Sequence, residues 1–127
     1  MPILRSLLIC DDVIQREDSQ YDVLGIKRVF TVNTLPCKGR FKVFALIDGM
    51  PSGSVKLSVR FTKESGVQLA EFQQSDFIHP EFDGHLWHIY NVFVEIMSIG
   101  QFELIYLVND LELGRLPFAV ETSMPFL

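Results

Sequence analysis

The sequence predicts an all-β protein, a single-domain antiparallel β-sandwich of immunoglobulin-like or jelly-roll type with about eight strands. In residues 54–62 (SVKLSVRFT) apolar side chains alternate strictly with polar ones, which is typical of a strand with one buried and one solvated face. Similar stretches recur between turn formers at intervals of roughly 8–12 residues, with no convincing helix between them. A sheet with one dry face needs a second layer to cover it, so two layers are expected.

Four strands are expected in the first half of the chain, over residues 3–10, 21–33, 41–48 and 54–62. The first is apolar on both faces, which favours a place in the interior of its sheet. Gly25 indicates a bulge or tight bend within the second.

Four more strands are expected over residues 67–72, 85–94, 102–108 and 111–121, and residues 73–84 form the longest irregular stretch. A helix over 85–97 competes with the third of these strands, but β-branched and aromatic residues favour the strand. Asn109 and Asp110 are expected to form the turn of the last hairpin. Pro117 limits the returning strand to an edge or to a bulge near its end.

Composition fits one domain over residues 1–127, since 48% of the residues are hydrophobic and eleven are phenylalanine. The net charge of −5 argues against nucleic-acid binding, and no apolar run is long enough for a membrane helix or a signal peptide. A cytoplasmic protein is therefore expected.

The charge is divided unevenly along the chain. Residues 1–63 carry ten Lys and Arg against six acidic residues, a net of +4, and residues 64–127 carry Arg115 against ten, a net of −9. This asymmetry permits a head-to-tail contact between copies in a homo-oligomer, and ordinary solvated edges are the alternative.

Two cysteines are too few for a disulfide framework. Cys10 ends an apolar run and is expected to pack as a small hydrophobic residue, whereas Cys37 lies in a turn-like stretch. The spacing gives no support to a bridge between them.

Two stretches carry a resemblance to a known group of proteins. Residues 8–13 (LICDDV) followed by 21–29 (YDVLGIKRV), together with a closing GQFEL…ND hairpin, resemble a family of short, uncharacterised bacterial β-sandwich proteins. The resemblance covers about a third of the chain, and Leu111 stands where that family has glycine. It implies a single-domain sandwich and brings no catalytic residues.

The most suggestive chemistry lies between residues 76 and 88, where all three histidines stand among carboxylates. Histidine and carboxylate are ligands of zinc and similar metals, so a metal site of Asp76, His79, Asp83 and His85 is one hypothesis. His85 and His88 are three apart and would lie on opposite faces of a strand. A solvated loop whose polar residues cap turns is the alternative.

The same stretch carries the apolar residues Phe77, Ile78 and Phe82, which either fold back over the end of the sandwich or contact a partner. The first functional hypothesis is accordingly a non-enzymatic module for protein binding or self-assembly, without a cofactor, acting through this loop and an exposed sheet edge. A metal-binding sandwich or small metal-dependent enzyme is the second hypothesis, and a carbohydrate-binding module is the third.

Overall fold

The computed structural model describes residues 2–17, 20–81 and 84–123, and within these ranges the regular elements are all β-strands. The strands are β1 (Ile3–Cys10), β2 (Asp12–Gln15), β3 (Tyr21–Leu24), β4 (Val29–Val32), β5 (Cys37–Asp48), β6 (Gly53–Lys63), β7 (Gln68–Ile78), β8 (Leu86–Ile96), β9 (Gly100–Val108) and β10 (Leu111–Thr122). The predicted all-β class is confirmed. No helix that could cross a membrane occurs in the described ranges.

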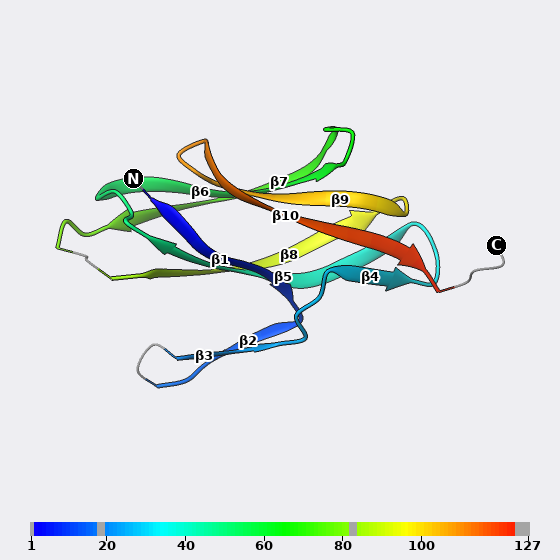
Figure 1. Ribbon diagram of the computed structural model, residues 1–127, viewed down its shortest axis with the longest axis horizontal. Helices are drawn as coiled ribbons and strands as arrows, with labels where there is room; N and C mark the ends of the chain where they lie inside the picture. The colour runs from blue at the N-terminus through cyan, green and yellow to red at the C-terminus, as the bar shows by residue number, and fades with distance from the viewer. Residues whose placement is uncertain (1, 18–19, 82–83, 124–127) are drawn as a thin grey trace.

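The strands form three sheets with the orders β1-β5-β8, β4-β10-β9-β6-β7 and β2-β3. The two larger sheets lie face to face, and the β2–β3 hairpin projects beyond the three-stranded sheet (Figure 1). Pairing is antiparallel except between β4 and β10, which run parallel. The described chain thus has ten strands where the sequence predicted about eight.

The difference in strand number has two sources, because β2 lies outside the predicted strands and a further strand arises from a division at Gly25. The predicted strand over 21–33 divides there into β3 and β4, which belong to different sheets. Gly25 has a φ of +67°, and a Cβ atom at this position would overlap the carboxylate of Asp11. Only glycine fits such a turn without strain, so the expected bend becomes a complete change of direction.

The core lies between the two large sheets and contains the predicted dry face of β6. Its members from β6 are Val55, Leu57, Val59 and Phe61, and those from β5 are Phe41, Val43, Ala45 and Ile47. The rings of Phe41 and Phe61 meet edge to face across the interface with centroids 5.7 Å apart. The Tyr90 hydroxyl of β8 donates a hydrogen bond of 2.8 Å to the Leu57 carbonyl of β6. These contacts join the sheets at their centre.

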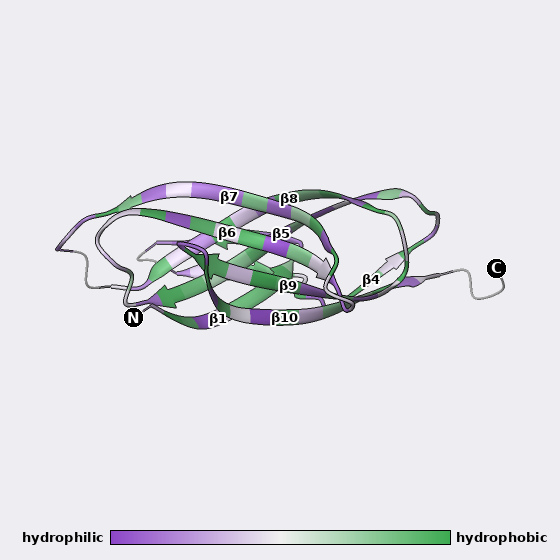
Figure 2. Cartoon of the chain, turned by 90° about the horizontal axis from the view of Figure 1, so that it is seen from above, coloured by the Kyte–Doolittle hydropathy of each residue, from purple (hydrophilic) through white to green (hydrophobic). Residues whose placement is uncertain are grey.

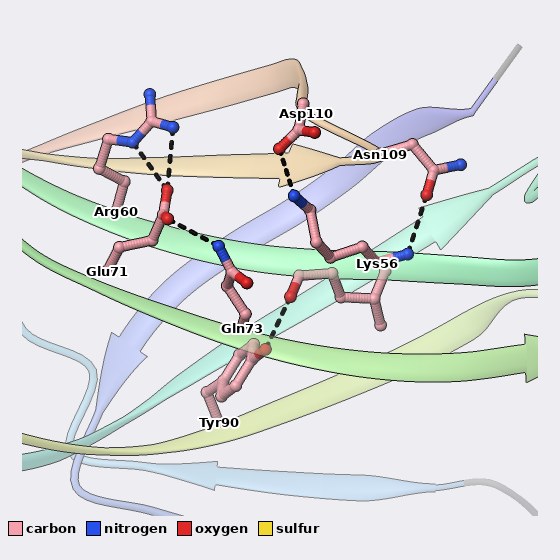
Figure 3. Close-up of polar contacts among 8 residues, drawn as sticks. Lys56, Arg60, Glu71, Gln73, Tyr90, Asn109 and Asp110 are labelled. Atoms are coloured by element: carbon pink, nitrogen blue, oxygen red, sulfur yellow. Dashed lines mark hydrogen bonds and ion pairs between the residues drawn. The ribbon is translucent and has the colours of Figure 1, made fainter.

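The other face of β6 carries the polar side chains that the alternation predicted, of which Lys56 and Arg60 reach solvent whereas Ser58 and Thr62 are buried. Lys56 bonds to Asp110 at 2.6 Å, and Arg60 bonds to Glu71 at 2.9 Å (Figure 3). Ser58 is only 2% exposed, although it lies on this face. Its longer neighbours on the flanking strands account for the burial, because β6 is an interior strand with β7 on one side and β9 on the other.

Pro117 lies in β10, which is an interior strand between β9 and β4. The pairing with β4 begins only at Ala119, so β10 has a single neighbour at the level of Pro117. The missing N–H of the proline therefore costs no ladder hydrogen bond on that side. The Pro117 carbonyl accepts a hydrogen bond of 2.7 Å from Nε of Arg28.

The bond between Tyr90 and Leu57 gives a test of the contact between the sheets. Replacing Tyr90 by Phe removes the hydroxyl and leaves the Leu57 carbonyl without this donor. We expect the free energy of unfolding in urea to fall by about 1 kcal/mol. Tyr21→Phe is the matched control, because the Tyr21 ring packs between Phe44 and Trp87 outside the main core. Equal losses in both variants would contradict this role for the Tyr90 hydroxyl.

Candidate functional site

The segment predicted as an irregular loop over 73–84 is half strand. β7 continues to Ile78 in unbroken register with β6 from Phe61 onward, pairing Phe72 with Val59 and Phe77 with Ser54. The Gln, Ser and Asp residues of this stretch have weak strand propensity, so the sequence alone did not reveal the strand. A strongly formed partner strand overrides that local preference. Residues 79–85 alone separate β7 from β8.

β7 and β8 form two long edges on the same side of the molecule. Each has eleven residues and pairs with one neighbour, β7 with β6 and β8 with β5. They lie beside each other along one long side, seen at the top of Figure 2, with β1 and β10 along the opposite side. Nε2 of His88 on β8 lies 3.3 Å from Oε1 of Gln74 on β7 and links the two edges.

On the opposite side of the molecule, the edges of the two large sheets are protected from pairing with a further strand. β1 is an edge strand and not the interior strand predicted, but β10 of the other sheet packs against it. A Cβ atom at Gly114 of β10 would lie 2.6 Å from Cδ2 of Leu4, so glycine permits this close approach. The register of β1 also shifts between Leu4 and Ser6, and β4, the remaining edge, has only four residues. Bulges and short strands are common protections of sheet edges.

Of the two predicted contact residues that the structure describes, Phe77 is the exposed one. Its side chain is 64% exposed, and it borders a shallow hollow with Lys56, Asp76 and Asn109. The Asp76 carboxylate accepts a hydrogen bond of 2.8 Å from the Phe77 N–H and fixes the strand there. Ile78 is 5% exposed and belongs to the core, while Phe82 lies outside the described residues.

The predicted metal ligands that the structure describes, Asp76, His79 and His85, have separate partners. Nδ1 of His79 accepts a hydrogen bond of 3.2 Å from the Glu81 N–H. Nδ1 of His85 forms a hydrogen bond with the carboxylate of Asp48, whose pKa is lowered mainly by its hydrogen bond to Arg5 and further by the one to His85. Asp83 lies outside the described residues, and the residues that are described include no group of three His, Cys, Asp or Glu able to hold a metal. The metal site stays a prediction.

His88 was not among the residues predicted for the site. It lies between the sheets, 6% exposed, with Nδ1 2.6 Å from the Tyr106 hydroxyl. We assign Nδ1 as the acceptor of the Tyr106 proton and Nε2–H as the donor to Gln74. Burial lowers the pKa of His88 to about 4, against a smaller opposite effect of the Asp76 carboxylate. The neutral ring thus anchors the β7 edge to the core; its signal in the sequence was its place on the same strand face as Tyr90.

The two cysteines remain free thiols. Cys10 is fully buried, as predicted for a small hydrophobic residue, and its Sγ lies 3.7 Å from the Lys42 carbonyl. Burial raises the pKa of the Cys10 thiol above its ordinary value. A thiol of this kind is unreactive, so the structure gives no nucleophile at Cys10.

Comparison with known proteins leaves the fold as the only shared property. No protein-family model matches the chain, and no curated protein matches it. One similar structure is an alkylpurine DNA glycosylase from Pseudomonas fluorescens, solved with DNA containing an abasic site analogue. The alignment covers 94% of this chain and 30% of the glycosylase, with 11% sequence identity and a TM-score of 0.51. An immunoglobulin-like protein from Pseudomonas aeruginosa aligns over 95% of this chain and 97% of its own, with 14% identity and a TM-score of 0.47. The chain thus spans about a third of the length of the glycosylase.

The low pKa of His88 predicts a specific loss of stability in acid. Between pH 6.5 and about 4 the unfolded chain protonates this histidine while the folded chain excludes the proton. The free energy of unfolding therefore falls as the pH is lowered through this window, by about 3 kcal/mol from this group. Below pH 4 its contribution no longer changes.

Urea unfolding at a series of pH values measures this loss, and His88→Gln is the comparison. The difference in stability between wild type and His88→Gln should shrink between pH 6.5 and 4, because other titrating groups are common to both proteins. A difference that is constant across this window would show that His88 is not held neutral.

Proposed function

We propose that the protein is a non-enzymatic interaction module, an immunoglobulin-like or jelly-roll β-sandwich that binds a protein partner or a second copy through the edge of β7. The observation that carries the proposal is an open edge strand of eleven residues that ends in an exposed phenylalanine. Such an edge accepts an additional strand through its free main-chain donors and acceptors, and side chains along it provide specificity.

The composition of β7 supports binding at this edge. The strand reads QLAEFQQSDFI and contains no lysine or proline, two residues that commonly prevent an edge from pairing. Its register with β6 shifts only near its start, between Phe61 and Thr62, and is regular toward Phe77. The strand is thus regular toward Phe77, where the Asp76 carboxylate occupies the Phe77 N–H and the other outward main-chain groups of the edge would pair with an added strand.

The outer face of the five-stranded sheet is a weaker candidate for contact because its charges already have partners. Arg115 bonds to Glu103 and Glu112, and a similar pair joins Arg60 and Glu71. Gln73 extends that pair with a hydrogen bond of 2.8 Å to Glu71 (Figure 3). Burying such pairs requires their desolvation without a gain of new partners, so the edge is favoured over the face.

Charge indicates the kind of partner. Asp76 on β7 and Glu95 on β8 make no ion pair with any described residue. Both lie on the two open edges, so an approaching strand that carries Lys or Arg would be complementary to this side. In self-association, the basic residues 1–63 of a second copy would supply that charge.

The test replaces the exposed aromatic residue of the edge. Phe77→Ser should weaken self-association about tenfold or more, since it removes a large apolar side chain from the contact. The measurement is sedimentation equilibrium over a range of protein and salt concentrations. Salt should weaken association of the wild type if charge contributes.

Phe93→Ser is the matched control, because Phe93 is 62% exposed but lies on the outer face of the three-stranded sheet below Arg40. It should leave the association constant unchanged. Equal weakening by both substitutions would contradict the assignment to β7, and a wild type that is monomeric at all concentrations would exclude self-association and leave a foreign partner. Point substitutions are preferred to deletion of 74–83, since Gln74 and Ile78 contact the core.

A further inference from the structure

An apolar cavity of about 180 Å³ lies between the two large sheets at the end where β8 turns into β9. It is at the far end of β6 from Phe77, because Lys63 and Leu69 line it whereas Ser54 pairs with Phe77. An engineered apolar cavity of about 150 Å³ is known to stay dry and to bind benzene. The volume here is therefore sufficient for one aromatic ring with a short substituent.

Phenylalanine dominates the lining. Five of these side chains surround the cavity: Phe30, Phe41, Phe61, Phe102 and Phe118. Most of their contacts with each other are tilted or edge to face, with centroids 5.0 Å apart for Phe30 and Phe41 and 6.0 Å apart for Phe61 and Phe118. A flat aromatic ligand would extend this arrangement, since aromatic rings prefer edge-to-face and offset contacts.

Lys63 is the cationic side chain among the residues that line this cavity. Lys63 follows Phe61 by two positions on β6, so its side chain leaves the strand on the core side, opposite Phe102. It makes no ion pair with any described residue. Glu95 also borders the cavity, but it is exposed and alternates on β8 with the inward residues Val94 and Ile96. The charge available to a ligand inside is therefore positive.

We propose that this cavity is a binding site for a small aromatic carboxylate, with the ring among the phenylalanines and the carboxylate at the amino group of Lys63. The rim supports entry from solvent, because Leu69 and Met97 border the cavity and are themselves exposed. A void of this kind leaves its lining without dispersion contacts on one side, and a bound ring restores them.

The test compares phenylacetate with 2-phenylethanol, which has the same ring and chain but no charge, by NMR titration of the full chain. Phenylacetate should bind wild type three- to fivefold more tightly than the alcohol, in line with a partly exposed ion pair. Lys63→Gln should remove this preference. Lys38→Gln, on the exposed part of β5, is the charge-matched control and should retain it.

Leu69→Trp at the rim is a second, independent variant, and its larger side chain should weaken binding of both compounds. Leu69 is 46% exposed, so this substitution is compatible with folding, which the melting temperature checks. The proposal is overturned if neither compound gives a saturable shift, if acid and alcohol bind wild type equally, or if Leu69→Trp leaves both affinities unchanged. Loss of the preference in Lys38→Gln as well as in Lys63→Gln would also overturn the role of Lys63.

Discussion

The contact between the dry face of β6 and the three-stranded sheet is the constraint on which the structure depends. β6 has a core face of Val55, Leu57, Val59 and Phe61 and two hydrogen-bonded neighbours, β7 and β9. The Tyr90 bond to the Leu57 carbonyl and the meeting of Phe41 with Phe61 fix the two sheets over one another. Because the sheets are held there, the open edges of β7 and β8 come to the same side, and the ends of the sheets enclose the phenylalanine-lined cavity.

The two long sides of the molecule differ in how far their edge strands are protected from pairing with a further strand. On one side a register shift, a four-residue strand and close packing at Gly114 leave little room for another strand. On the other side two strands of eleven residues each have a single hydrogen-bonded neighbour, and a neutral, buried His88 holds them together through Gln74. Unprotected edges are a liability for aggregation, so their retention on one side alone supports a use in binding.

Much of the fold could be predicted from the sequence because side-chain alternation in a strand has a period of two. That rule gave the faces of β6 and β8, and the pair Asn109 and Asp110, both with positive φ, forms the predicted turn. Alternation does not say which strands are neighbours, so the edge position of β1 and the interior position of β10 could not be derived. Of the residues predicted to contact a partner, Phe77 is exposed and its role stays a prediction, whereas the burial of Ile78 follows from pairing with β6, which no local pattern in 73–78 reveals.

The parallel pairing of β4 with β10 bears on the order in which the chain folds during synthesis. Val29 pairs with Ala119, so β4 cannot pair until about ninety further residues have been synthesised. β9 also pairs with β6 only after about forty further residues, and until then β6 has β7 as its one neighbour in the sheet. Contacts this distant in sequence form slowly. Until β9 and β10 have been synthesised, the core faces of β5 and β6 therefore lack part of their cover, and apolar surface exposed in this way favours aggregation.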